Sequence, residues 1–104
     1  MSGNVSSQEP SHSSSKSGEE KRKQQDQLLF MMLIQQYHQI AQVGLGKIEN
    51  PATGELEVDL SSARFATDTL TMLQAFTKGN ITNELAEYLE TVSNPLVKEV
   101  KELS

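Results

Sequence analysis

The chain has 104 residues, no cysteine, a net charge of −5 and a pI of about 4.9. This length allows one domain, and the lack of cysteine excludes disulfides and fits a reducing compartment. The acidic balance disfavours nucleic-acid binding, because such binding needs a basic face that displaces counterions from phosphates. Residues 1–43 hold four acidic and four basic residues, whereas residues 44–104 hold ten and five, so the excess charge lies in the second part.

The N-terminal segment, residues 1–24, is rich in Ser and in charged residues. It has too little apolar surface to offset the entropy of ordering, which predicts a disordered tail before a helical domain of residues 25–104. We see no hydrophobic segment typical of a secretory signal and no stretch of about 20 apolar residues that would span a membrane. The sequence therefore predicts a cytoplasmic protein.

The densest hydrophobic signal is the run of seven apolar residues from Leu28 to Ile34. We predict a helix over Gln25–Val43, because apolar residues recur there at steps of three and four. The expected inward side consists of Phe30, Leu33, Ile34, Tyr37, Ile40, Ala41 and Gly44. Leu28, Met31 and Met32 fall on the otherwise polar side. Because an apolar side must be covered, we predict that these three residues contact either other helices of the chain or a second protein.

A connector follows this first helix. Gly44 and Gly46 are expected to end the helix, since glycine adopts the left-handed conformation without steric cost. The residues Asn50–Gly54 predict a turn. The alternation of polar and apolar residues over Glu55–Val58 fits either a short strand or an extended strap across the helices, and we favour the strap because no partner strand is evident.

The second helix is expected at Leu60–Lys78, with Asp59 as its N-cap and Gly79 beyond its C-terminus. We expect its apolar residues to face the core; they are Ala63, Phe65, Ala66, Leu70, Met72, Leu73 and Phe76.

A third helix is predicted at Asn83–Ser93, with Thr82 as its N-cap and an apolar side of Leu85, Tyr88, Leu89 and Val92. Asn94-Pro95 interrupts the pattern, because the residue before proline avoids helical angles and proline suits the first position of a helix. We therefore expect a separate fourth helix, Pro95–Glu102, with Leu96, Val100 and Leu103 inward. Together the elements predict an all-α fold, a small three- to four-helix bundle.

Candidate ligand-binding residues are sparse. His38 is the only histidine in the expected domain, and zinc sites need three or four ligands, so a surface histidine is the simpler interpretation. The alternating acids Glu55, Glu57 and Asp59 resemble part of a calcium loop, but the position that requires glycine is occupied by Leu60. We expect neither a metal nor a cofactor.

The turn Lys78-Gly79-Asn80 precedes the third helix and suggests an anion pocket, although helix capping alone accounts for these residues. No Gly-rich phosphate loop accompanies the turn. No pairing of a nucleophile with a general base is evident either, and Asp68 lies on the polar side of its helix. We therefore expect a protein that is not an enzyme.

Two motifs resemble a known family. One is Pro51-Ala52-Thr53-Gly54-Glu55-Leu56-Glu57-Val58-Asp59-Leu60, and the other is Thr77-Lys78-Gly79-Asn80-Ile81-Thr82. They resemble a short bacterial family of helical proteins catalogued only as a domain of unknown function, and the likeness extends over residues 28–89. The resemblance implies a helical fold and supplies no catalytic residues.

The function expected from these features is association. We predict a homo-oligomer, most simply a symmetric dimer, with Leu28, Met31 and Met32 at the contact. One alternative is a module that docks the same residues on a different protein. Another is a peripheral membrane binder, which the acidic domain disfavours since anionic lipids attract basic segments. A small-ligand carrier is the remaining alternative.

Overall fold

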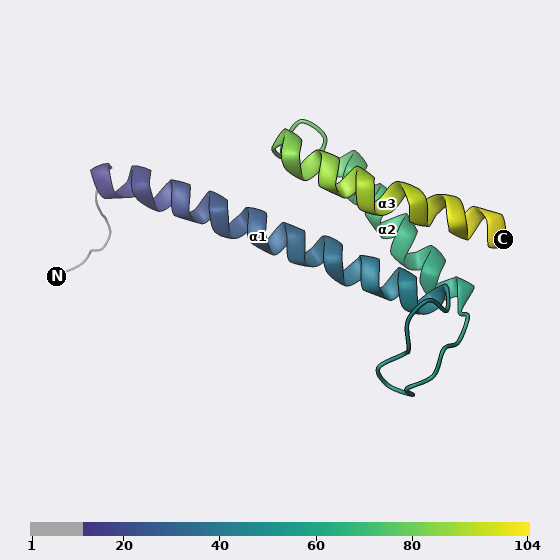
Figure 1. The fold of residues 1–104 in the computed structure, drawn as a ribbon. Coiled ribbons are helices and arrows are strands. Elements are labelled where there is room, and N and C mark those ends of the chain that lie inside the picture. The colour runs from purple at the N-terminus through teal and green to yellow at the C-terminus, as the bar shows by residue number, and fades with distance from the viewer. Residues whose placement is uncertain (1–11) are drawn as a thin grey trace. The chain divides into compact units, whose positions relative to one another are not determined.

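The structure is a computed structural model that describes residues 12–104, with side chains from Gly18 onward. Three α-helices follow one another: α1 (His12–Gly44), α2 (Leu60–Thr77) and α3 (Asn83–Leu103) (Figure 1). The predicted all-α class is confirmed. The chain divides between Phe30 and Met31 into two units, and the core of the described residues lies in the second.

The first helix begins earlier than we predicted. We expected its firm part at Gln25–Val43, whereas α1 extends from His12 to Gly44. The good helix formers of residues 19–27 account for the part of this extension next to Gln25, because Glu, Lys, Arg and Gln cost little in a helix. Residues 1–11 of the expected tail lie outside the described residues. The division into a tail of residues 1–24 and a domain of residues 25–104 stays a prediction.

The end of α1 is a Schellman motif built on Gly46. Gly46 has a φ of +77°, and its N–H donates to the carbonyl of Val43 at 3.0 Å. The N–H of Lys47 donates to the carbonyl of Gln42 at 2.9 Å. Such paired bonds satisfy the last carbonyls of a helix and require a left-handed residue. Gly46 thus ends α1 as predicted, while Gly44 still belongs to the helix.

The connector forms the expected turn but not the expected strap. The side chain of Asn50 accepts from the N–H of Ala52 at 2.8 Å, and Gly54 has a φ of +71°. Among the described residues, Glu55–Val58 forms no strand and makes a single antiparallel bridge, between Val58 and Leu45. Leu56 and Val58 remain exposed, and the loop extends away from the helices (Figure 1). It therefore covers no helix.

The helices α2 and α3 form an antiparallel hairpin, in which α3 turns back along α2 (Figure 1). Both predicted N-caps are confirmed: Asp59 accepts from the N–H of Ser62, and Thr82 accepts from the N–H of Leu85. Gly79 provides the left-handed residue in the turn, with a φ of +81°. The hairpin is therefore fixed at three points by capping and turn chemistry that the sequence indicates.

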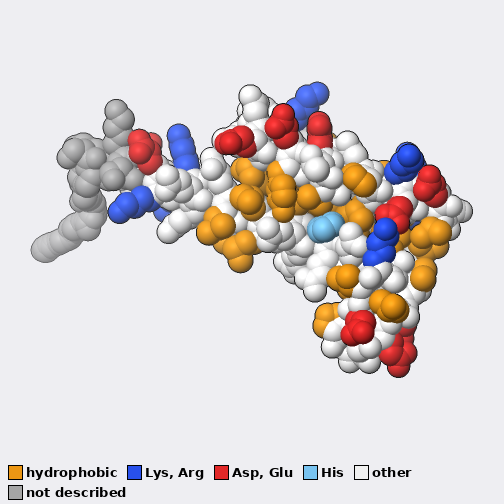
Figure 2. Space-filling model, viewed as in Figure 1, with side chains coloured by type: hydrophobic (Ala, Val, Ile, Leu, Met, Phe, Trp, Pro, Cys, Tyr) orange, Lys and Arg blue, Asp and Glu red, His pale blue; other side chains and the backbone are white. Residues whose placement is uncertain are grey.

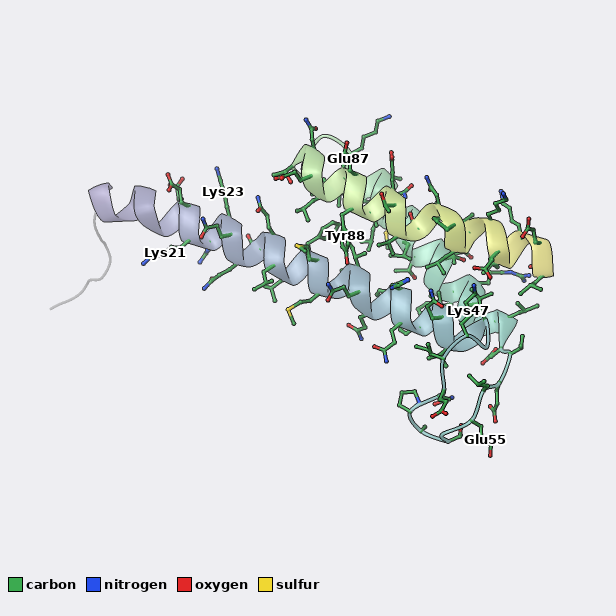
Figure 3. The ribbon with its side chains drawn as sticks, in the orientation of Figure 1. Lys21, Lys23, Lys47, Glu55, Glu87 and Tyr88 are labelled. Atoms are coloured by element: carbon green, nitrogen blue, oxygen red, sulfur yellow. The ribbon has the colours of Figure 1, made fainter. Side chains whose placement is uncertain are left out.

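Our prediction of a helix break at Pro95 is wrong, because α3 is continuous through this residue. An interior proline loses a backbone hydrogen bond and destabilises a helix by about 3 kcal/mol. Packing offsets this cost: the buried side of α3 continues on both sides of the proline, with Leu89 and Ser93 before it and Leu96 and Val100 after it. Glu87 of α3 extends into solvent, whereas its neighbour Tyr88 is half-buried (Figure 3).

The core is built from three helices at steps of three and four residues. Its fully buried large side chains include Ile34 of α1, Leu70 of α2 and Leu89 of α3. Each such side chain contributes roughly 1.5–3 kcal/mol of burial free energy. The other buried hydrophobic residues are Ala41, Leu45, Ala63, Ala66, Leu85, Leu96 and Val100. The periodicity of α1 predicted Ile34, Ala41 and Gly44 as inward, and all three are buried.

The predicted inward side of α2 is correct only in part. Ala63, Ala66 and Leu70 are buried, but Phe65, Met72 and Phe76 are exposed. The reason is geometric: at 100° per residue these three lie on the side of α2 opposite to Leu70. In α3, Leu103 is likewise exposed instead of inward, since it occupies the last turn of the helix.

Candidate interaction site

The three residues predicted as an interface differ in exposure. Leu28 and Met32 are 58% and 54% exposed, whereas Met31 is half-buried. The neighbouring Leu29, which the sequence did not single out, is 61% exposed. Leu28 and Leu29 belong to the first of the two units, and Met31 and Met32 begin the second. An exposed large apolar side chain loses the free energy that burial would provide, so this segment of α1 is a candidate contact.

Charge is absent from this part of α1. Residues 27–46 contain neither Asp, Glu, Lys nor Arg, and the polar positions are mainly glutamines. Gln35, Gln36 and Gln39 are exposed. Glutamine side chains form hydrogen bonds without a net charge, so a partner that packs on this segment buries no charged side chain of residues 27–46. The basic cluster lies earlier on α1, where Lys21 and Lys23 extend into solvent (Figure 3).

A second exposed apolar surface lies on α2. We call it the α2 stripe; it consists of Phe65, Thr69, Met72 and Phe76. Phe65 is 59% exposed, Met72 41% and Phe76 77%. Thr69 is half-buried, and its hydroxyl donates to the carbonyl of Phe65 at 2.8 Å, so its polar group is satisfied within the helix. The ring of Tyr37 lies beside that of Phe65, with centroids 6.0 Å apart.

The sequence carried a signal for the α2 stripe that its periodicity alone did not resolve. The apolar residues of α2 form two sides, and the small residues Ala63 and Ala66 mark the one that packs closely. Large aromatics on the other side then remain for a different contact. On the face of the molecule shown in Figure 2, hydrophobic side chains are exposed to solvent among acidic and basic ones.

A groove of about 470 Å³ lies between the last turns of α2 and the first turns of α3. Ala75, Ile81, Ala86 and Leu89 provide its apolar lining, with Lys78 at the turn. Nearby, the amide of Gln74 donates to the hydroxyl of Ser93, and this hydroxyl donates to the carbonyl of Leu89 at 2.7 Å. The buried Ser93 is thus satisfied. The volume falls in the range of small-molecule sites, about 300–1,000 Å³.

The other sequence candidates show no ligand-binding geometry. His38 is half-buried instead of exposed and shares a hydrogen bond of 3.1 Å with Gln42. Glu55 and Glu57 are exposed in the loop, and Asp59 is occupied as a helix cap. Within residues 12–104, no group of three or more His, Asp or Glu is placed to hold a metal ion. In the same part of the chain, no helix is long and apolar enough to cross a membrane.

Asp59 is the ionisable group whose environment is most clearly altered. Its side chain accepts from the hydroxyl of Ser62 at 2.8 Å and from the N–H of Ser62 at 3.2 Å. These hydrogen bonds favour the carboxylate and lower the pKa of Asp59 from its ordinary value of 3.8. The shift follows from capping and does not indicate acid–base chemistry.

The comparisons with known proteins give a family. No curated protein and no solved structure matches the chain. A family model with the description "Domain of unknown function (DUF1844)" matches residues 27–96, a span that includes both motifs, the α2 stripe and most of α3. The resemblance expected from the two motifs is therefore confirmed, and the chain belongs to this family.

Proposed function

We propose that this protein acts by self-association and not by catalysis, through the apolar segment of α1 that includes Leu28, Met31 and Met32. The observation that carries this proposal is that the large apolar side chains of Leu28 and Met32 are 58% and 54% exposed to solvent. Met31 is half-buried, so only part of its side chain is available to the contact. A thioether side chain adapts to different neighbours, which suits methionine to such contacts.

A second copy of the chain is the partner that fits this segment best. The protein has a net charge of −5, so two copies repel each other at long range, and a contact between them is least unfavourable where it brings no like charges together. Residues 27–46 meet this condition. In a two-fold contact the same surface serves both subunits, and an uncharged apolar surface is compatible with itself.

The test is the mass in solution, measured by size exclusion with light scattering. We expect the wild type to be dimeric and the double variant Leu28→Glu/Met32→Glu to be a folded monomer, with helicity checked by circular dichroism. The control is Thr91→Glu/Asn94→Glu, which adds the same charge at exposed positions of α3 and is expected to remain dimeric. A folded dimer of the α1 variant would refute the proposal.

The groove between α2 and α3 supports a second candidate function, the binding of a small apolar molecule. Its support is the volume of about 470 Å³ with Ile81, Ala86 and Leu89 in the lining. We expect the dye 1-anilinonaphthalene-8-sulfonate to fluoresce on binding, and Ala86→Phe to abolish the signal by filling the groove. Equal fluorescence of the two proteins would exclude this groove as the site.

A further inference from the structure

The spacing of the residues in the α2 stripe is the same when it is read from either end of the helix. Phe65, Thr69, Met72 and Phe76 are separated by four, three and four residues. At 100° per residue they lie within about 60° of one another around the helix. When two such helices pack antiparallel about a two-fold axis between residues 70 and 71, Phe65 of one copy lies opposite Phe76 of the other. Thr69 then lies opposite Met72.

We propose that the α2 stripe is a two-fold contact between copies of this chain, in which α2 packs antiparallel against α2 of the second copy. The register places each aromatic ring against a ring, and aromatic pairs contribute beyond the area that they bury. The smaller pair, Thr69 with Met72, lies at the centre, where the helices come closest. This inference rests on the proposed self-association for the identity of the partner and adds a second contact surface, on α2.

The register brings one pair of like charges to the same height, Arg64 and Lys78 of the second copy, but both point more than about 100° away from the centre of the stripe. Arg64, Asp68 and Lys78 are the charged residues of α2 and its C-cap. In an antiparallel two-fold pair, each flank of one helix adjoins the same flank of the other. Asp68 lies on the flank shared with Ala75 and therefore adjoins Ala75 of the second copy, with no like charge directly opposite. The hydroxyl of Thr69 is satisfied within its own helix, so the contact leaves no hydroxyl unpaired.

The size of the stripe sets the strength expected of the contact. Taking about 200 Å² for a whole large side chain, the three exposed residues offer roughly 350 Å² per copy, or about 700 Å² for the pair. Stable interfaces bury about 1,200–2,000 Å². The α2 contact alone therefore belongs to the weak, concentration-dependent class, and we expect the variant Phe76→Glu to raise the dissociation constant of the dimer at least tenfold.

Cysteine trapping tests the register directly, since the natural chain contains no cysteine. Phe65→Cys and Phe76→Cys are prepared as separate proteins and oxidised alone and as an equal mixture. The mixture is expected to form a disulfide-linked dimer, because residues 65 and 76 of different copies lie opposite each other. Each variant alone is expected to stay unlinked, because its two cysteines are about 16 Å apart along the helices and a disulfide requires Cα atoms within about 7 Å.

The outcomes separate this inference from the proposed function. If Leu28→Glu/Met32→Glu gives monomers while Phe76→Glu leaves the dimer intact and the mixture stays unlinked, the α2 contact is wrong and the proposed function stands. If Phe76→Glu weakens the dimer and only the mixture cross-links, the α2 contact is correct, whatever the α1 variant does. Linkage of either single variant at the same yield as the mixture would refute the antiparallel register.

Discussion

Gly44 of α1 and Ala63 of α2 approach so closely that no side chain fits between them. A Cβ atom on Gly44 would lie 2.8 Å from the backbone nitrogen of Ala63 and 3.0 Å from its Cβ. It would also lie 2.8 Å from the carbonyl oxygen of Asp59, the N-cap of α2. The backbone reinforces this crossing, because the N–H of Asp59 donates to the carbonyl of Gly44 at 2.7 Å. The end of α1 and the start of α2 are therefore held at van der Waals contact.

We predict that Gly44→Ala lowers the free energy of unfolding by about 1–3 kcal/mol, since the added methyl group meets backbone atoms that cannot rotate away. Denaturant unfolding followed by circular dichroism measures this change. The control is Gly18→Ala, where the new Cβ meets nothing within 4 Å and the higher helix propensity of alanine is expected to be neutral or slightly stabilising. Equal stability of Gly44→Ala and the wild type would show that the crossing is looser than described.

Most of the core could be predicted from the sequence, because it depends on local periodicity. Ile34, Ala41, Leu70 and Leu89 lie on the apolar sides that the spacing indicates, and all are buried. The caps at Asp59 and Thr82 were equally readable, since capping uses residues adjacent in the chain. What a local pattern cannot specify is which of two apolar sides of a helix meets its neighbours, and this is where Phe65 and Phe76 were misassigned.

The candidate site was predictable to a smaller extent for the same reason. The sequence places Leu28, Met31 and Met32 on the otherwise polar side of α1; Leu28 and Met32 are exposed there, but Met31 is half-buried, and Leu29 is exposed as well. The sequence does not predict that Ser93 is buried, because a serine in a helix gives no apolar signal. Its hydroxyl can be buried because it accepts a hydrogen bond from Gln74, which lies on another helix.

The hydrogen bond from Gln74 to Ser93 joins α2 to α3 beside the groove. We predict that Ser93→Ala lowers the free energy of unfolding by about 1 kcal/mol, because it removes this bond while it keeps the small volume. A double-mutant cycle with Gln74→Ala isolates the pair, and we expect a coupling of about 0.5–1.5 kcal/mol. Strictly additive effects would mean that the two side chains do not interact in solution.

Pro95 provides a test of whether α3 is one helix. Because it lies inside α3 and is exposed, we predict that Pro95→Ala raises the free energy of unfolding, by up to about 3 kcal/mol. The substitution restores a backbone donor and removes the clash with the preceding turn. As a control, Asn94→Ala changes an exposed neighbour and is expected to stay within about 0.5 kcal/mol of the wild type. A loss of stability in Pro95→Ala would instead support two helices, with proline at the start of the second.

The cap at Asp59 predicts a specific dependence of stability on pH. The hydroxyl of Ser62, and then its backbone N–H, hold the pKa of Asp59 below 3.8 in the folded protein. A group with a lowered folded-state pKa binds its proton more readily in the unfolded chain, so it stabilises the fold above 3.8 and loses this effect as the pH falls through its folded-state value. Asp59→Asn keeps a good N-cap without the charge. We therefore expect the wild type to unfold at a higher temperature than Asp59→Asn at neutral pH, and the difference to shrink in acid.

Thr82→Ala is the matched control for this pH dependence. It removes the neutral cap of α3, whose hydroxyl accepts from the N–H of Leu85 at 3.2 Å, and is expected to cost about 1 kcal/mol. Because threonine does not titrate, this cost should be the same at neutral and acidic pH. Thermal unfolding of the four proteins, wild type, Asp59→Asn, Asp59→Ala and Thr82→Ala, across this range separates charge from capping. If the Asp59→Asn difference persists unchanged in acid, the carboxylate of Asp59 does not stabilise α2 through its charge.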